Sequence, residues 1–568
     1  MMSQMKRPVQ FFCRLTILAA TLLMLASCGG SGGGGSSAGN DPPPVQQEPL
    51  LQASEVQAII QAAVNSVNIP VEVAVTNRVG TILGVYGSAN APTMGHGNFQ
   101  GPSGNLVAAD ELAVALARTG AFFSNDEAPL SSRTVRFISG IHFPPGVAGT
   151  SNAALYGIEN TNRGCSFDVT YNPGKEVPPA TLINGTSPGL GVITGKFDVD
   201  DSQPFAVNPG GVPIFENGIL VGGIGVVAYD ATSNPPNDNY DAAEYAAFVG
   251  STVKIPGDSN AFGPMPAPPG VVIINGVALP FVNNTSLPAG YSPGPASGTP
   301  VGFTVGPISS PGPTPEGYLV GPLASAYPNG LSQNDVMDVV NAAISTAQNT
   351  RAAIRLPINR PAAMMISVSD LDGNFLAIYR IHDATIFSID VSAAKARNVV
   401  YFSSTAGELP GVYADNNPGS IDLPGVPAGT SITNRTISFG AQPFYPPGID
   451  GSGNGPFFNL YLQDTANPCT QGSQPANQHQ NGIVFFPGSL ALYRNGVMVG
   501  GLGVSGDGVD QDDFVTSGGA AETTYTNSSD PAQTGQGFEA PTAIRADQIV
   551  IRNVRLPYTK FPRNPAFH

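Results

Sequence analysis

The side chains that could do chemistry in this sequence are few, and the histidines come first because the chain has only five of them. His382 stands directly before Asp383, whose carboxylate could accept one ring proton and so orient the imidazole toward a metal. His96 occupies the corresponding, longer loop in an earlier part of the chain. The alternative for both is a polar histidine on a surface loop. Three histidines remain. His142 is a packing candidate, His479 lies in a loop rich in Gln and Asn, and His568 is the terminal residue.

A second set of polar side chains lies on one expected helix, 388–402. Lys395 and Arg397 follow Asp390 by about one and a half to two turns. Cations placed in this way can pair with the carboxylates of a bound ligand. The alternative is that they are ordinary charges on the helix surface. Tyr379, on the preceding strand, is either a ligand contact or a core aromatic.

An acidic cluster follows late in the chain. Its oxygens could hold a hard cation, but the residues lack the spacing of a calcium-binding loop. The alternative is an acidic turn or the N-terminus of a helix. The cluster consists of Asp507, Asp510, Asp512 and Asp513. The sequence contains neither an HExxH zinc motif nor a phosphate-binding loop with its lysine, so we expect a binding protein rather than an enzyme.

An internal repeat decides which elements must position these side chains. Two nearly identical ten-residue stretches, NGILVGGIGV and NGVMVGGLGV, begin at Asn217 and Asn495. Further pieces recur in the same order, for example 51–64 with 331–344. Such self-similarity over a long stretch predicts a domain that was duplicated whole. The glycine runs lie in expected strand hairpins, where they would allow close packing of strands or helices.

Periodicity gives the elements of each copy. Helices are expected at 55–67, 108–123 and 388–402, and strands at 71–75, 80–86, 134–138, 214–227, 272–281, 365–368 and 375–379. The predicted fold class is α+β, with two tandem homologous domains. Each domain is expected to be a mostly antiparallel sheet with packed helices, an α-β sandwich, and the pair is expected to form a pseudo-dimer.

The N-terminus reads as an export signal for lipid attachment. Lys6 and Arg7 precede an apolar run that is short for a membrane span, and the segment Leu25-Ala26-Ser27 leads into Cys28. Cys28 would be the first mature residue and would carry the lipid. The alternative is a single transmembrane anchor with an incidental cysteine.

The resulting domain plan has five parts. They are a lipoprotein signal peptide with its lipobox (1–28), a Gly/Ser/Pro-rich tether (29–48), a first half (49–285), a Pro/Gly-rich linker (286–328) and a second half (329–568). Segments 231–270 and 405–432 have turn composition and are expected to be long insertions or linkers.

Charge and cysteine usage narrow the possible partners. A net charge of −16 without a contiguous basic stretch argues against nucleic acid. Of the four cysteines, Cys13 lies in the signal and Cys28 is assigned to lipid. Cys165 and Cys469 follow a Pro-Pro-Gly segment in their respective halves at similar distances. In an oxidising compartment they would form a disulfide or stay as two free, buried thiols.

Three motifs of the second half carry a family resemblance. They are VSDLDG from Val368, SID from Ser388 followed by AKA at 394–396, and VGGLGVSG from Val499. In this order and spacing the second half resembles the GlcG/HbpS-like family of small haem-binding domains, which is also related to the C-terminal domain of PduO. The first half resembles the family only through the internal repeat.

The first half also departs from the pattern. It carries Asn77, Leu116 and Val227 where the second half has Asp370, Lys395 and Ser505. If ligand binding in the family depends on those polar residues, the first half is a structural partner.

The resemblance implies an α+β sandwich, usually oligomeric, with haem or a related tetrapyrrole as ligand. Haem iron usually takes an axial ligand such as His, Tyr, Met or Cys, so His382, His96 and Tyr379 become candidates. Lys395 and Arg397 become candidates for the propionates.

We therefore expect an exported, lipid-anchored haem-binding protein that serves haem sequestration, uptake or redox sensing and is not catalytic. The alternative is a cofactor-free surface lipoprotein that acts as a protein-interaction or structural module. Membrane contact would come through the lipid only, and a protein partner or homo-oligomer is compatible with either. Gly29 lacks the aspartate that retains lipoproteins at the inner membrane, which favours the outer membrane of a bacterial envelope.

Overall fold

The computed structural model describes most of the residues that follow the tether in the sequence. It describes residues 48–96, 106–158, 161, 165, 167–185, 209–228, 239–263, 271–294, 312–414, 419–521 and 537–562. Residues 48–568 form one compact unit. The signal peptide with Cys28, nearly all of the tether, and His568 lie outside the described residues. Within those residues, no helix has both the length and the apolar character needed to cross a bilayer.

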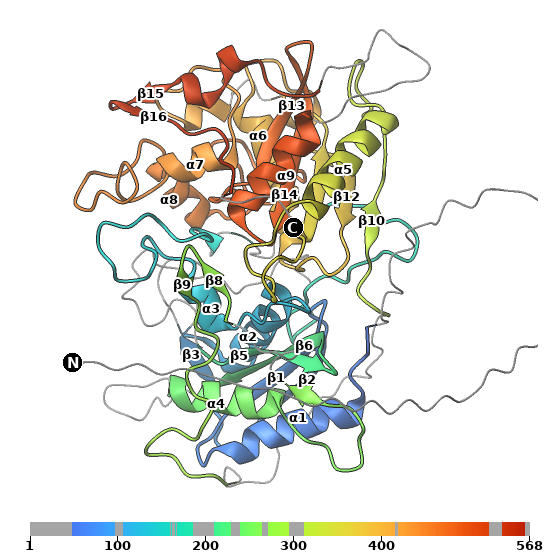
Figure 1. Ribbon diagram of the computed structural model, residues 1–568, viewed down its shortest axis with the longest axis vertical. Helices are drawn as coiled ribbons and strands as arrows, with labels where there is room; N and C mark the ends of the chain where they lie inside the picture. Colours follow the sequence, from blue (N-terminus) through green and yellow to red (C-terminus); the bar gives the residue numbers. More distant parts are fainter. Residues whose placement is uncertain are drawn as a thin grey trace, which may run out of the picture. The chain divides into compact units, whose positions relative to one another are not determined.

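The first half is built on one antiparallel sheet with strand order β2-β1-β6-β5-β7 (Figure 1). Its strands are β1 Glu72–Asn77, β2 Ile82–Gly87, β5 Gly211–Glu216, β6 Ile219–Val227 and β7 Phe262–Gly263. Helix α2 (Ala109–Phe123) packs on β6, β5 and β1, while α1 (Ala53–Ser66) and α4 (Tyr240–Ser251) pack together and cover the other side chains of the same strands. Smaller elements are β3 Met94–His96, β4 Leu106–Ala108, α3 Ser132–Phe137, β8 Ile273–Ile274 and β9 Val277–Ala278.

The second half has a sheet of order β10-β12-β11-β14-β13. Its strands are β10 Gly317–Val320, β11 Met364–Ser369, β12 Phe375–Arg380, β13 Ser489–Arg494 and β14 Val497–Gly506. Helix α6 (Ser388–Phe402) packs on β14 and β11, and α5 (Gln333–Gln348) packs with α9 (Val509–Ala521). The rest comprises α7 Asn434–Gly440, α8 Phe458–Ala466, β15 Val550–Ile551, β16 Val554–Arg555 and the 3₁₀ turns η2 Gly411–Tyr413, η3 Gly419–Asp422, η5 Thr542–Ile544 and η6 Ala546–Gln548.

The repeated sequence segments occupy the same places in the two sheets. In each sheet the four shared strands have one order, with β1, β2, β5 and β6 matching β11, β12, β13 and β14. The register also agrees, since Val75 pairs with Ile224 and the matching Val368 pairs with Leu502. The mixed α/β class with antiparallel sheets is therefore confirmed, and the duplication itself stays a prediction.

Three expectations about elements were wrong. The segment 134–138 belongs to helix α3, because Ser131 and Thr134 form a capping box that starts a helix there. The expected insertion 231–270 contains α4, whose alanine-rich face is buried. The expected linker 286–328 supplies β10, which pairs with β12 and extends the second sheet.

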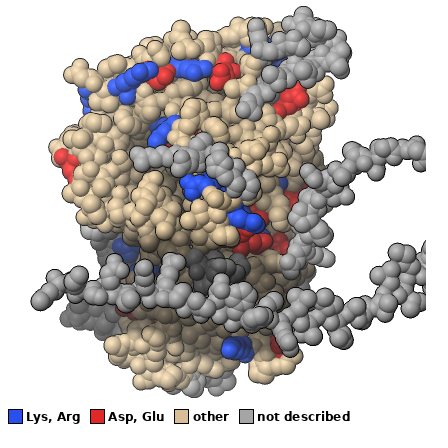
Figure 2. Space-filling view, in the orientation of Figure 1, with Lys and Arg blue, Asp and Glu red and all other residues tan. Residues whose placement is uncertain are grey.

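The surface is poor in charge, and several charges lie inside. On the face in Figure 2 the Lys, Arg, Asp and Glu side chains are scattered among uncharged residues. By contrast, Arg355, Asp383, Lys395, Arg397 and Asp512 are all buried. Because a buried charge needs a partner, these residues show where the fold has built polar contacts.

The glycine runs let each major helix touch the backbone of its sheet. A Cβ added to Gly503 of β14 would overlap the carbonyl oxygen of Ser392 in α6, and one on Gly225 of β6 would overlap that of Ala113 in α2. The prediction that these glycines serve close packing is confirmed.

We expect Gly503→Ala to lower the free energy of unfolding by roughly 2 to 3 kcal/mol, because the added methyl meets backbone that cannot move aside. The matched control is Gly453→Ala, where a Cβ would meet nothing within 4 Å. Its expected effect is below about 0.5 kcal/mol. Urea unfolding of both variants measures the difference, and equal stability would contradict the packing role.

Candidate functional site

Helix α6 carries the charged side chains that the sequence offered for ligand binding. Lys395 and Arg397 are completely buried, so the alternative of surface charges is wrong. All fifteen residues of α6 are buried, because the glycine contact presses the helix against the sheet and other segments cover its outer side.

Lys395 is fully engaged within the fold. Its Nζ donates to the Val504 carbonyl at 2.7 Å and to Asp512 Oδ2 at 3.0 Å, and it lies over the ring of Phe486. Burial lowers the pKa of Lys395, while the Asp512 carboxylate opposes this change. Lys395 is therefore a structural ion pair here and has no accessible donor for a ligand.

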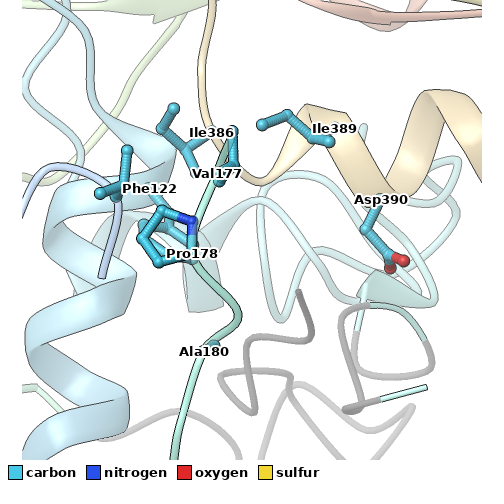
Figure 3. A pocket seen from close by; sticks show the side chains of 8 residues that line it. Phe122, Val177, Pro178, Ala180, Ile386, Ile389 and Asp390 are labelled. Atoms are coloured by element: carbon cyan, nitrogen blue, oxygen red, sulfur yellow. The ribbon is translucent and has the colours of Figure 1, made fainter. Parts of the chain in front are cut away.

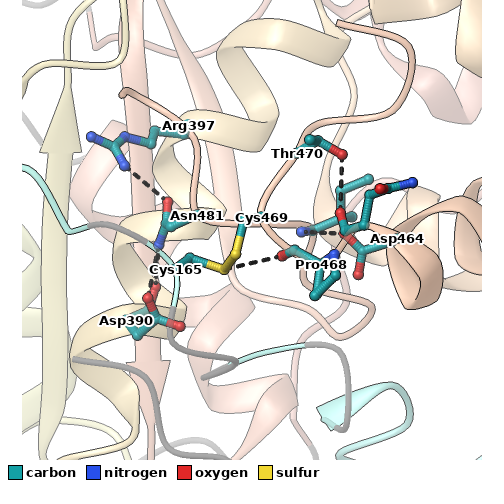
Figure 4. Close-up of a disulfide and its surroundings, with 10 residues drawn as sticks. Cys165, Asp390, Arg397, Asp464, Pro468, Cys469, Thr470 and Asn481 are labelled. Atoms are coloured by element: carbon teal, nitrogen blue, oxygen red, sulfur yellow. Dashed lines mark hydrogen bonds between the residues drawn. A yellow bond between two sulfur atoms is a disulfide. The ribbon is translucent and has the colours of Figure 1, made fainter. Parts of the chain in front are cut away.

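Arg397 differs from Lys395 because one nitrogen of its guanidinium has no hydrogen-bond partner among the described residues. Its Nε donates to the Gly373 carbonyl at 2.9 Å, and its Nη1 donates to Asn481 Oδ1 at 3.1 Å (Figure 4). The guanidinium carbon lies 4.1 Å from the ring centroid of Phe375. Among the described residues, the buried Nη2 has no hydrogen-bond partner. Burial lowers the pKa of Arg397.

A short polar chain leads from Arg397 to a cavity between the two halves. Asn481 Nδ2 donates to the carbonyl and to Oδ1 of Asp390, both at 3.1 Å. Asp390 lines the cavity together with Val79, Phe122, Val177, Pro178, Ala180, Ile386 and Ile389 (Figure 3). The cavity volume is about 10 Å³, which is room for about one water molecule. Ligand pockets are usually roughly 300 to 1,000 Å³.

A segment of the first half, residues 167–180, lies on the second half, and we call it the strap. Phe167 stacks on Phe375 with ring centroids 5.5 Å apart. Asn172 donates through Nδ2 to the Gly321 carbonyl at 2.6 Å, and Lys175 Nζ donates to the Glu316 carbonyl at 2.6 Å. The strap has no helix or strand of its own.

The strap is anchored by a disulfide. Of the two alternatives for the cysteines, the structure contains the bond between Cys165 and Cys469, beside the Arg397, Asn481 and Asp390 chain (Figure 4). The bond joins the two halves covalently across a sequence separation of 304 residues.

His382 lies elsewhere, at the far end of β12. Its side chain is 56% exposed, and its Nδ1 lies 2.8 Å from Glu316 Oε2. The carboxylate that orients this imidazole is therefore Glu316, and the expectation that Asp383 does so was wrong. Nearby, Tyr379 makes an edge contact with Tyr318 of β10, with ring centroids 4.9 Å apart. Burial raises the pKa of Tyr379.

Asp383 turns inward because its backbone is left-handed, with φ of 61°. Its Oδ2 accepts from Arg355 Nη1 at 2.6 Å, and its Oδ1 accepts from Arg78 of the first half. The backbone N–H of Asp126, also from the first half, donates to both oxygens at 3.1 Å. Although burial opposes it, the guanidiniums of Arg355 and Arg78 hold the pKa of Asp383 well below its usual range.

The burial of His479 was not predicted from the sequence, which placed this residue only in a loop rich in Gln and Asn. It is 5% exposed, and its Nδ1 donates to the Asp372 carbonyl at 2.7 Å. Its Nε2 lies 3.6 Å from Oδ2 of Asp168 in the strap, and its own carbonyl accepts from Tyr413 at 2.5 Å. The signal was the density of Gln and Asn around it, since Gln471, Gln474, Gln480 and Asn481 are also buried. Gln480 donates to Gln474, and Gln471 donates to the hydroxyl of Tyr413.

Comparison with known proteins finds a similarity over part of the second half. Residues 331–521 match the HbpS-like family. The family is described as "Haem degrading protein HbpS-like", and the predicted resemblance is confirmed over this range. A crystal structure of a PduOC–heme complex is 22% identical, with 34% of this chain and 92% of that chain covered and a TM-score of 0.20. The Klebsiella pneumoniae protein ORFY is 20% identical, with 34% and 91% covered and a TM-score of 0.21. Comparison with curated proteins gives no match.

Two further histidines, His96 and His142, belong to the first half and lie apart from β12 and α6 in sequence. His96 is half-buried in β3 of the first half. His142 lies against Phe444, as expected for a packing residue, and its Nε2 is 3.0 Å from Asp450 Oδ1.

The aspartates of the acidic cluster belong to the turn before α9 and to that helix, and each contacts a cation of the protein. Asp507 pairs with Arg355, Asp512 with Lys395, and Asp510 and Asp513 with Arg435. No group of metal-ligating residues occurs in the ranges that the structure describes.

The five predicted binding residues thus do not converge on one cavity. Within the HbpS-like half, Arg397 meets Phe375 at the start of β12, whereas His382 follows its end. Arg397 Nη2 has no partner among the described residues, and His382 has an exposed ring. Lys395 is bound to Val504 and Asp512.

Replacing Asp383 by Asn should lower the free energy of unfolding by about 3 kcal/mol at pH 7, because the buried guanidiniums of Arg78 and Arg355 each lose one carboxylate partner. The lowered pKa means that the native carboxylate contributes stability above about pH 4 and loses it as the pH falls further. The difference between wild type and variant should therefore shrink in acid.

The neighbouring substitution His382→Ala is the control, because this side chain is exposed and should change stability by less than about 0.5 kcal/mol. Thermal unfolding between pH 3 and 7 makes the comparison. Similar losses in both variants would rule out a special role for the buried carboxylate.

Proposed function

We propose that the HbpS-like half is a tetrapyrrole-binding module and that haem is its ligand. The observation that carries this proposal is the family match over residues 331–521. Two local features agree with it. His382 is an accessible imidazole whose Nδ1 is held by Glu316, which leaves Nε2 for a metal. Arg397 has, on Nη2, N–H groups that no described residue accepts, and guanidinium N–H groups commonly bind carboxylates.

The arrangement in this structure does not accommodate a porphyrin next to Arg397. The cavity beside Asp390 has the volume of about one water molecule, and the strap lies over Phe375. Binding there requires a change of conformation, whereas the His382 ring is already exposed.

We further propose that the two halves arose by duplication and that the first half is a structural partner in a pseudo-dimer. In place of Lys395 it has Leu116, and in place of Ser505 it has Val227. Asn77 keeps only the turn-forming role of Asp370, because its Oδ1 accepts from the Thr81 N–H at 2.8 Å. The first half instead contributes the strap.

Export and anchoring are also proposals. Cys28 would carry lipid in a bacterial envelope, with the outer membrane favoured, and the protein would act without catalysis in haem sequestration, uptake or redox sensing. Labelling with a fatty-acid analogue in cells should mark the wild type and not Cys28→Ala, and equal labelling of both would contradict the anchor.

The direct test of function is a haemin titration of the chain from Asn40 onward, which contains the whole compact unit. We expect a saturable Soret band at one or two haemins per chain and a weaker band in His382→Ala. The matched control is His142→Ala, a histidine that packs between the halves. An unchanged band in His382→Ala would remove this residue as the axial ligand.

A cofactor-free interaction module is the second candidate, and the water-sized cavity favours it. It predicts no saturable spectral change with haemin under oxidising or reducing conditions. That result would overturn the tetrapyrrole proposal.

A further inference from the structure

Arg397 presents a donor that the described fold leaves unsatisfied. Its Nη2 is completely buried and has no partner among the described residues, although an unpaired buried donor normally destabilises a protein. The other nitrogens are used, since Nε and Nη1 bond to Gly373 and Asn481. Such a fixed and incompletely paired guanidinium is prepared to accept one more anionic group.

An aromatic ring stands beside this donor. Phe375 contacts the Arg397 guanidinium and also stacks against Phe167 of the strap. The ring of Phe167 therefore occupies the surface of Phe375 that a planar ligand could use, close to the Arg397 guanidinium. A planar ligand with a carboxylate would use the same two features, by stacking and by charge-assisted hydrogen bonding.

We propose that Arg397 and Phe375 form a binding site for a planar, carboxylate-bearing ligand, and that the strap occupies this site while the Cys165–Cys469 disulfide is intact. This inference rests on the proposed function and deepens it, because it gives the ligand class and the regulation of the HbpS-like half.

The strap is held by polar and apolar contacts but has no helix or strand of its own. Val169 and Tyr171 pack against the hydrophobic core to which Val177 belongs, so release of the strap would expose these side chains. Its polar contacts with described residues outside the first half come from Asp168, Asn172 and Lys175. They include a hydrogen bond from the Asn172 backbone N–H to the Leu319 carbonyl at 2.8 Å. None of these contacts belongs to a helix or a sheet ladder.

The far end of the strap is tied to the first half, since the Thr181 carbonyl accepts from Arg118 at 2.7 Å. On the other side of Cys165, Tyr156 stacks on Tyr461 of the second half. Breaking the disulfide would therefore release a loop that stays attached at both ends.

The chemical step that opens the strap is a thiol–disulfide exchange with a dithiol. The sulfur–sulfur bond of Cys165 and Cys469 breaks and takes up two electrons and two protons, which gives two thiols. The dithiol loses the same electrons and protons and becomes a cyclic disulfide. Nothing else is consumed.

The test measures binding of metal-free protoporphyrin IX to the chain from Asn40 onward by quenching of its fluorescence. Because this probe has no iron, a dithiol reductant does not change it, and axial ligation by His382 does not contribute. We expect reduced protein and the Cys165→Ser, Cys469→Ser double variant to bind roughly tenfold more tightly than oxidised protein. Phe167→Ala should gain affinity in the oxidised state, because the ring that competes with the ligand is gone.

Two further arms test Arg397. The dimethyl ester of protoporphyrin lacks the carboxylates and should bind equally weakly to oxidised and reduced protein. Arg397→Gln should lose the preference for the free acid over the ester, and the ester arm keeps the test valid if this variant fails to fold.

The outcomes separate the two proposals. Equal affinity of oxidised, reduced and double-variant protein for protoporphyrin would overturn the strap inference, and saturable haemin binding in the same samples would leave the function standing. Failure of both haemin and protoporphyrin to bind in any state would overturn both.

Discussion

The fold of residues 48–568 depends on a buried carboxylate that two halves of the chain share. Asp383 takes charge-assisted hydrogen bonds from Arg355 in its own half and Arg78 in the other. The same network reaches Asp507, which accepts from Arg355 and from Asn125 of the first half. Around it the cores merge, for Phe123 and Phe387 stack with ring centroids 4.2 Å apart. The two halves therefore form one compact unit in spite of their repeated sequences.

This shared interior explains the unusual state of α6. The glycines of β14 bring the helix onto the sheet backbone, and the first half closes over the opposite side, so even Lys395 and Arg397 are removed from water. Lys395 Nζ is hydrogen-bonded to Val504 and Asp512, whereas Arg397 Nη2 has no partner among the described residues. A buried donor that is hydrogen-bonded stabilises the fold. A buried donor without a partner offers a ligand more binding free energy, because a new hydrogen bond removes the cost of leaving it unpaired.

Most of the regular elements could be predicted, because they rest on local patterns. The helix 388–402 and the strands on both sides of the Asp372 turn follow from periodicity and turn residues, and the structure has them within a residue or two. Helix α3 was missed because a six-residue segment of mixed polarity gives little periodic signal, although the capping residues Ser131 and Thr134 were visible.

The site was harder to predict because burial and partners are set by distant segments. The sequence placed His382 beside Asp383, yet the left-handed backbone of Asp383 sends its carboxylate inward and leaves the imidazole to Glu316. Glu316 comes from a segment that looked like a linker. In the same way, nothing near Arg397 indicated that residues 167–180 would cover Phe375. The burial of His479 had a local signal in the Gln and Asn residues around it.

Strand β10 has a consequence for where the HbpS-like half can be cut from the chain. The family match begins at residue 331, but β10 lies before it at Gly317–Val320 and pairs with β12. A fragment that starts at the family boundary would leave the hydrogen-bonding edge of β12 without its neighbour and open to strands of other molecules. The sheet of the second half therefore begins before the matched residues, and β10 covers an edge of β12 that would otherwise be open.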